Sequence, residues 1–181
     1  MRLSLDDFYL DRSNLSLARR ARLNFDHPRA IDWERLERVL EEFRAGKEAA
    51  APRYDFATHS RRSGDARVPA ARWMIVEGLW LFRRPELRAR FALKVFIRMG
   101  RELGVERRVR RDVAERGRTE AQVMEQWTRH TEPMFAKFVA PQEKLADVVL
   151  EAPVSEEDAS ALAERLAGQD FSKSKEKAVG I

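Results

Sequence analysis

The chain has 181 residues, of which 44% are hydrophobic and 36% are charged, and its formal net charge is +5. This length suits one domain, and the apolar share is sufficient for a packed core. The absence of cysteine excludes disulfides and thiolate metal sites. No stretch reaches the ~18 apolar residues of a membrane span, and the N-terminus lacks a signal-peptide pattern. We therefore expect a cytoplasmic protein without membrane contact, whose excess of arginine favours an anionic partner.

The first residues, 1–5, have the pattern of a short strand that runs directly into Asp6-Asp7-Phe8-Tyr9. Open α/β sheets bind their ligands at the carboxyl ends of strands, so a carboxylate here could accept a proton from a substrate hydroxyl. The alternative is a solvated turn anchored by an aromatic side chain. Further along, Asn24-Phe25-Asp26-His27-Pro28 combines an aromatic face with hydrogen-bonding groups. It suits a sugar or base site, or else a loop in which Asp26 or His27 caps the next helix.

The next segment predicts an amphipathic helix that is capped by Asp32 and ends before Gly46. After it, residues 52–56 and 66–69 look extended around a polar turn at 60–65, which predicts a small hairpin. In this hairpin Tyr54 offers a ring for stacking on a base, and His59 offers a hydrogen-bonding group for its edge. These residues could recognise a pyrimidine, although aromatic residues in a hairpin also commonly cover a core.

The second half of the chain alternates strand and helix patterns, which predicts an α/β domain with a mainly parallel sheet. A capping box at Thr119 and Gln122 starts one of the helices, and Pro133 is expected to kink it. We expect residues 169–181 to form a disordered tail. The expected strands are 73–76, 92–97 and 146–150, and the expected helices are 85–91, 101–118, one beginning after Thr119, and 155–167.

Arginines crowd the helix predicted at 101–118. In a helix Arg107 and Arg108 lie beside Arg111, so one face could clamp phosphate oxygens. A solvated basic face and a nucleic-acid surface are the alternatives, but the chain has no aromatic-rich strand motif of the RNA-recognition type. The cluster consists of Arg107, Arg108, Arg110, Arg111, Arg116 and Arg118.

Taken in order, these clusters resemble the uridine kinase family of P-loop kinases from Met1 to about Leu150. The resemblance implies a P-loop NTPase-like parallel sheet with flanking helices, a small hairpin and a helical lid at about 99–118, within a domain of residues 1–168. The motifs that carry it are Asp6-x-Phe8-Tyr9, Asn24-Phe25-Asp26-His27-Pro28, Pro52-x-Tyr54-Asp55-Phe56-x-x-His59-Ser60-Arg61, Glu77-Gly78, Arg107-Arg108-x-x-Arg111-Asp112, Glu115-Arg116-Gly117-Arg118, Pro133-Met134-Phe135 and Ala146-Asp147.

The resemblance further implies phosphorylation of the 5′-hydroxyl of uridine or cytidine by ATP or GTP with Mg²⁺. Asp6 matches the general base, Arg108 and Arg111 match lid residues near the reacting groups, and Glu77 matches an acidic residue near the magnesium. The other matching residues fall into two groups. Those that match substrate-binding residues of the family are Tyr9, Phe25, Asp26, Tyr54, His59, Arg116 and Gln126. Those that match lid residues binding the ATP phosphates are Arg111, Arg116 and Arg118. In this light a nucleic-acid partner is not expected, and a homo-oligomer is possible.

Two departures from the family pattern stand out. Arg98, Gly100 and Gly104 replace the acidic residues and the arginine expected where the lid begins. The larger departure is the absence of a Gly-x-x-x-x-Gly-Lys-Ser/Thr loop and of the strand before it, which together take roughly 30 residues. Because that strand is central to the family's sheet, its neighbours should lose backbone partners at about 1–3 kcal/mol per buried group. We therefore expect an unstable or partner-dependent chain without kinase activity of its own.

Three other interpretations remain open. The leading one is a truncated gene model or a fragment of a uridine kinase-like enzyme, which would explain the missing loop. The chain could instead be a non-catalytic remnant that binds a nucleoside or a partner protein. Within the enzyme interpretation, another hydroxyl acceptor such as ribulose 5-phosphate or pantothenate is the alternative to a pyrimidine nucleoside.

Overall fold

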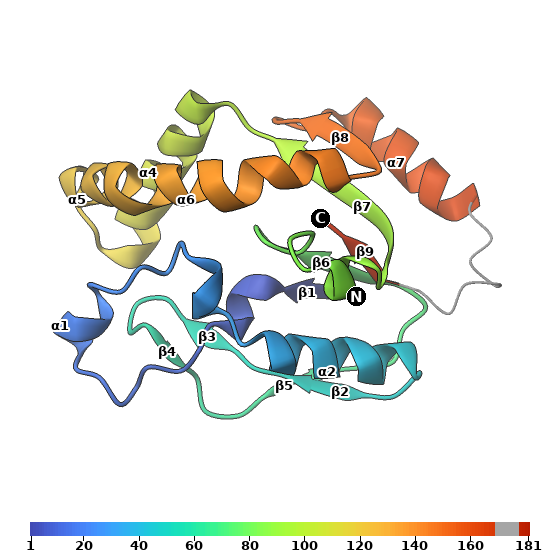
Figure 1. Cartoon of the computed structure of the whole chain (residues 1–181), viewed down its shortest axis with the longest axis horizontal. Coiled ribbons are helices and arrows are strands. Elements are labelled where there is room, and N and C mark those ends of the chain that lie inside the picture. The colour runs from blue at the N-terminus through green and yellow to red at the C-terminus, as the bar shows by residue number, and fades with distance from the viewer. Residues whose placement is uncertain (169–177) are drawn as a thin grey trace.

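The computed structural model describes residues 1–168 and 178–181, and a five-stranded sheet lies at its centre (Figure 1). The strand order is β1-β6-β9-β7-β8, and all neighbouring pairs are parallel. The structure therefore confirms the predicted α/β fold with a parallel sheet and flanking helices. The strands are β1 (Arg2–Ser4), β6 (Met74–Glu77), β9 (Ala178–Gly180), β7 (Phe91–Arg98) and β8 (Val148–Glu151).

Helices lie on both sides of this sheet, with α2 on one side and the run from α4 to α6 on the other (Figure 1). Among the described helices, none is long and apolar enough to cross a membrane. The helices are α1 (Leu17–Arg20), α2 (Trp33–Arg44), α3 (Pro85–Arg88), α4 (Arg101–Arg116), α5 (Glu120–Gln126), α6 (Glu132–Met134) and α7 (Glu156–Gly168).

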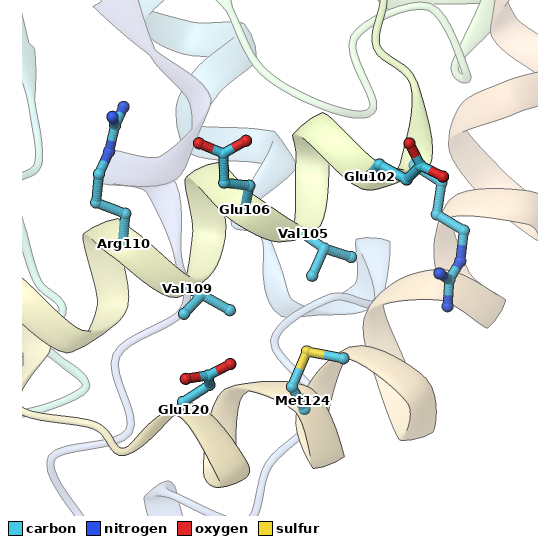
Figure 2. A pocket seen from close by; sticks show the side chains of 8 residues that line it. Glu102, Val105, Glu106, Val109, Arg110, Glu120 and Met124 are labelled. Carbon is cyan, nitrogen blue, oxygen red and sulfur yellow. The ribbon is translucent and has the colours of Figure 1, made fainter.

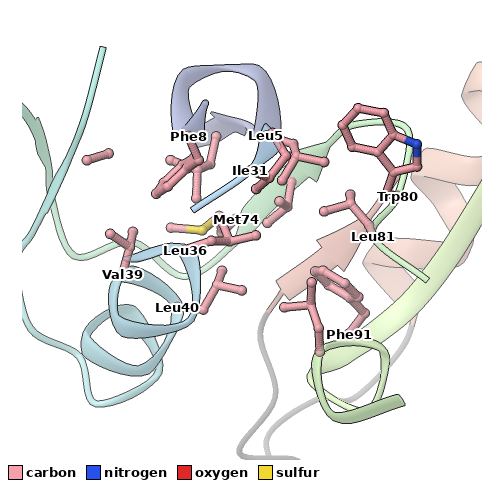
Figure 3. Close-up of a cluster of buried hydrophobic side chains, with 14 of the residues drawn as sticks. Leu5, Phe8, Ile31, Leu36, Val39, Leu40, Met74, Trp80, Leu81 and Phe91 are labelled. Atoms are coloured by element: carbon pink, nitrogen blue, oxygen red, sulfur yellow. The ribbon is translucent and has the colours of Figure 1, made fainter. Parts of the chain in front are cut away.

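The amphipathic helix predicted after Asp32 is α2. The Asp32 carboxylate caps it by accepting a hydrogen bond from the Arg35 backbone N–H at 3.1 Å. Its apolar face packs into the core, and Figure 3 shows Leu36 beside Met74 of β6 and Phe8. All three side chains are fully buried. The packing of α2 thus fixes the segment that follows β1, where the acidic motif begins.

The α4–α6 region forms an arm along the sheet. Gly117 ends α4 in the left-handed conformation with φ +63°, and Thr119 and Gln122 form the predicted capping box of α5. Beyond α5, two π-helical turns, η3 (Trp127–Thr131) and η4 (Phe135–Val139), lie on either side of Pro133. Proline has no N–H to donate, and such wider turns redistribute the remaining hydrogen bonds. The arm continues as the 3₁₀ helix η5 (Ala140–Leu145).

Of the three residues that depart from the family pattern where the lid begins, Arg98 and Gly104 have structural explanations. A Cβ at Gly104 would lie 3.3 Å from the Trp127 ring, so glycine lets this ring pack closely against α4. Arg98, at the end of β7, forms ion pairs with Glu143 and Glu151. Gly104 thus allows close packing within the arm, and Arg98 helps to hold the arm on the sheet.

The predicted hairpin forms with different partners. Residues 66–68 (β5) pair with β2 (Ala49–Ala51), and β3 (Tyr54–Asp55) pairs with β4 (Ser60–Arg61). The prediction that 52–56 pairs with 66–69 is therefore wrong. Pro52 lacks the N–H that would continue the outer ladder, and the Asp55 carboxylate accepts from the Ala57 and Thr58 N–H groups to close a tighter inner turn.

Strand β9 overturns two expectations. Residues 178–181 are not part of a disordered tail, because Ala178–Gly180 forms a strand between β6 and β7, whereas 169–177 lie outside the described residues. The Ile181 N–H donates to the Val76 carbonyl at 2.8 Å, and the Gly78 N–H donates to the Ile181 carbonyl at 2.9 Å. The two strands on either side of β9, which are β6 and β7, therefore do have backbone partners, contrary to the expectation of unpaired neighbours. A Cβ at Gly180 would lie 2.8 Å from the Phe82 ring, so the close packing here requires glycine.

Candidate functional site

One pocket of about 120 Å³ brings together all the predicted site residues except Glu77. It also includes Phe56 and Leu79, which the prediction of site residues left out. Phe56 could have been found, because it lies two residues after Tyr54 in the same aromatic motif, whereas Leu79 carries no sequence signal. The pocket is lined by Asp6, Tyr9, Phe25, Asp26, Tyr54, Phe56, His59, Leu79, Arg108, Arg111, Arg116, Arg118 and Gln126.

Aromatic rings form one wall of the pocket. The Tyr9 ring centroid lies 5.6 Å from that of Phe25 and 5.1 Å from that of Tyr54, and Phe56 lies 5.4 Å from Tyr54. The Tyr9 hydroxyl donates to the Phe25 carbonyl at 3.1 Å. In contrast, the Tyr54 hydroxyl oxygen is buried without a hydrogen-bond partner among the described residues. Buried polar groups are normally paired, so this hydroxyl has an unused capacity for a hydrogen bond at the pocket that Tyr54 lines.

His59 closes the aromatic wall. Its ring stacks on Phe25 with the centroids 4.8 Å apart and the planes 8° from parallel. Its backbone has φ +51°, a conformation that non-glycine residues seldom adopt and that is often found at functional sites. Burial and the nearby Arg118 and Arg116 lower the pKa of His59. Its imidazole is therefore neutral at pH 7 and can donate one hydrogen bond and accept another.

Asp6 provides a carboxylate in the 3₁₀ helix η1 (Leu5–Phe8), directly after β1. Burial, followed by the negative charge of Glu77, raises its pKa to about 6, against the opposing effect of Arg116 and Arg111. A carboxylate with a pKa close to neutrality is suited to take up a proton from a hydroxyl. Glu77 itself lies at the end of β6, where it accepts a hydrogen bond from Arg2 at 3.1 Å.

Side chains of the arm, from α4 to η3, close the pocket over Asp26. Arg108 donates to Asp26 at 3.2 Å, and the Thr131 hydroxyl donates to the second Asp26 oxygen at 3.1 Å. Arg108 and Arg118 both donate to the Gln126 side-chain oxygen, at 3.1 and 2.7 Å. Pockets for small molecules usually enclose roughly 300 Å³ or more. For such a ligand to enter, these lid side chains must therefore move.

The basic side of the pocket has the donors that phosphate oxygens need. Guanidinium groups bind phosphate through pairs of parallel hydrogen bonds. Arg116 lies over the Phe56 ring at 4.7 Å, which joins the basic side to the aromatic wall. No group of three or more metal-ligating side chains occurs within 1–168 and 178–181. Mg²⁺ in phosphoryl-transfer sites is held by one or two carboxylates and the substrate phosphates, so Asp6 and Glu77 fit that mode of binding.

Another hollow, of about 470 Å³, lies between α4 and α5 (Figure 2). Val105, Val109 and Met124 form its apolar part, and charged side chains of both signs surround them. None of the predicted site residues lines it. The predicted chemistry is therefore concentrated in the smaller pocket.

Comparisons with known proteins identify the family of the chain. Residues 2–159 match the family model described as "Phosphoribulokinase / Uridine kinase family". A uridine kinase of Chloroflexus aggregans is 41% identical over 144 residues, and one of Shewanella pealeana is 37% identical over 145. In each case the match covers 80% of this chain and 69% of the relative.

Solved structures show the same fold. A putative fructose transport system kinase from Silicibacter sp. TM1040 aligns with a TM-score of 0.64 and 21% identity, over 82% of this chain and 73% of that one. Phosphoribulokinase from Rhodobacter spheroides aligns with a TM-score of 0.64 and 20% identity, over 83% of this chain and 59% of that one. The parallel sheet and its flanking helices thus have the arrangement found in these kinases.

Proposed function

The chain belongs to the phosphoribulokinase / uridine kinase family, and on this premise we propose that it forms the nucleoside site and the lid of a kinase for the 5′-hydroxyl of uridine or cytidine. The observation that carries the proposal is the position of Asp6. This carboxylate, with a pKa of about 6, lies in one pocket with an aromatic wall and a group of arginines. A hydroxyl placed beside it would have a proton acceptor on one side and phosphate-binding groups on the other.

The aromatic wall suits the base of a nucleoside. A pyrimidine is flat and has hydrogen-bonding groups along its edge, so it requires ring faces together with a few polar groups. Tyr54 offers a hydroxyl without a partner, and His59 offers a neutral imidazole. Asp26 has two oxygens for the ribose hydroxyls, which would replace its present contacts with Arg108 and Thr131.

The lid, which we place at residues 99–118, would hold the phosphates. Arg111, Arg116 and Arg118 would contact a phosphate donor, ATP or GTP, and Glu77 with Asp6 would bind a magnesium ion that offsets the phosphate charge. The 181 residues contain no Gly-x-x-x-x-Gly-Lys-Ser/Thr loop. We therefore propose that this polypeptide binds the nucleoside by itself and transfers phosphate only when such a loop is supplied.

Phosphorylated sugars are the second class of acceptor, since the family also includes phosphoribulokinases. The aromatic wall favours a nucleoside over ribulose 5-phosphate, because an acyclic sugar phosphate offers no flat ring to stack. A purely non-catalytic binding role would not require the raised pKa of Asp6.

Calorimetric titration of the chain tests the proposal. We expect uridine and cytidine to bind, and ribose, which carries no base, to bind at least about tenfold more weakly because it cannot use the aromatic wall. Tyr54→Ala and His59→Ala should remove this preference. Equal affinity for ribose and uridine, or the absence of uridine binding by folded protein, would refute the nucleoside assignment.

A further inference from the structure

The lid arginines converge on one buried carboxylate, that of Asp112 on α4. Its side chain is fully buried, and it is not part of the pocket lining. Arg111 Nη2 and Arg118 Nη1 each lie 2.8 Å from its oxygens, and Arg116 Nη1 lies at 3.2 Å. Arg108 Nε, which is buried without a hydrogen-bond partner among the described residues, lies 3.8 Å away. A single carboxylate therefore contacts all four guanidinium groups that line the pocket.

The backbone of Asp112 also fixes the turn that brings these arginines together. Its carbonyl oxygen accepts from the Arg118 N–H at 3.2 Å and from the N–H of Gly117, the residue that ends α4. This places Arg116 and Arg118 on either side of a left-handed glycine. The carbonyl of Asp112 thus holds the turn after α4, and the carboxylate of the same residue holds the arginine side chains.

The charges around Asp112 explain why such a group is needed. Four guanidinium groups close together repel one another, and burial strengthens that repulsion. Burial alone would raise the pKa of Asp112, but the combined effect of Arg116, Arg111 and Arg108 is larger, and the net result is a lowered pKa. The carboxylate is therefore ionised at neutral pH. It offsets part of the positive charge of the four arginines, all of which line the pocket.

We propose that Asp112 is a positioning residue that preorganises the four lid arginines to bind a polyphosphate next to the nucleoside. The inference deepens the proposed function and rests on it. A preorganised clamp binds more tightly than the same groups on mobile side chains, because less side-chain freedom is lost on binding. Asp112 acts through the arginines and does not itself contact the ligand.

This proposal predicts the opposite of a simple charge effect. If only net charge mattered, removal of one carboxylate would make the site more positive and would strengthen anion binding. If Asp112 positions the arginines, Asp112→Asn weakens anion binding even though the site gains positive charge. The sign of the change therefore separates the two explanations.

Titration calorimetry with inorganic tripolyphosphate on the whole chain provides the test. We expect Asp112→Asn to weaken tripolyphosphate binding about tenfold or more. The matched control is Glu115→Gln, which removes the same charge from an exposed position of α4 and should leave binding unchanged or slightly tighter. Binding to Asp112→Asn that is as tight as in the wild type, or tighter, would overturn the proposal, as would the absence of tripolyphosphate binding by the wild type.

A second variant keeps the test decisive if Asp112→Asn does not fold. Asp112→Glu retains the charge but adds one methylene at a fully buried position, so the distances to the arginines must change. It should also weaken tripolyphosphate binding, and unchanged affinity would refute the positioning role. Uridine binding by the wild type is measured separately. Loss of uridine binding alone would count against the nucleoside function and leave the Asp112 result standing.

Discussion

The position of Asp6 implies that function reduces the stability of this fold. The carboxyl group ionises near pH 3.8 when it is unperturbed, and near pH 6 in the folded chain. Because the folded pKa is the higher one, the folded state gains stability from the retained proton at low pH. This stabilisation is lost as the pH rises from about 4 to 6. Above pH 6 the ionised carboxylate in its buried position is a net cost to folding.

The substitution Asp6→Asn removes this cost. A shift of about two pKa units corresponds to about 3 kcal/mol at pH 7.5 and to about 1 kcal/mol at pH 4.5. The variant should therefore gain about 2 kcal/mol over the wild type when the pH is raised from 4.5 to 7.5. It should also lose the ability to accept the proton of a nucleoside hydroxyl.

Urea unfolding followed by tryptophan fluorescence at several pH values measures this difference, since the chain has four tryptophans. Asp55→Asn serves as the control with the opposite sign. Hydrogen bonds from Thr58 and Ala57 lower the pKa of Asp55, so its ionised form stabilises the fold above pH 4. That variant should be less stable by a constant amount from pH 4.5 to 7.5. A stability difference between Asp6→Asn and the wild type that does not change with pH would refute the reasoning.

Three further predictions concern the sheet, the pocket and the arm. Gly180→Ala should destabilise the chain by about 1–3 kcal/mol, because the added Cβ meets the Phe82 and Phe91 rings. Gly100→Ala is the control in the same unfolding assay, because a Cβ there would have no atom within 4 Å. Equal stability of the two variants would contradict the role of β9. Tyr54→Phe removes a buried hydroxyl that has no hydrogen-bond partner among the described residues. Thermal unfolding should therefore show unchanged or higher stability, whereas calorimetry should show weaker uridine binding. A marked loss of stability would show that this hydroxyl has a structural partner. Gln142→Leu should cost about 2–4 kcal/mol in urea unfolding, because it removes the hydrogen-bond partner of the buried Phe82 N–H and of the carbonyls of Leu79 and Phe138. A cost below about 1 kcal/mol would argue against this network.

Local patterns in the sequence predicted most of the elements. Asp32 and Thr119 marked the starts of helices, and the strands expected at 73–76 and 92–97 correspond to β6 and β7. These signals are local, because capping and periodicity depend on residues within a few positions. The order of the motifs, through the family resemblance that it supports, likewise predicted which side chains share the pocket.

The features that the sequence did not predict depend on contacts between residues far apart in the chain. No pattern within residues 178–181 shows that they pair with β6 and β7, because four residues satisfy almost any strand prediction and their partners lie about a hundred residues away. The hairpin register failed for a related reason, since Pro52 and the Asp55 turn together choose the partner strands. The role of Asp112 also required coordinates, because only the fold shows that four arginines meet one carboxylate.

The most direct test of the central claim is the affinity of the chain for uridine and for 5′-deoxyuridine, measured at pH 8 on the wild type and on Asp6→Asn. If Asp6 faces the 5′-hydroxyl, the wild type should bind uridine about tenfold more tightly than 5′-deoxyuridine, because a hydrogen bond to a charged group contributes about 1.5–3 kcal/mol. In Asp6→Asn this ratio should fall toward one. The same ratio in both proteins would mean that the 5′-hydroxyl does not lie at Asp6, and would contradict the account.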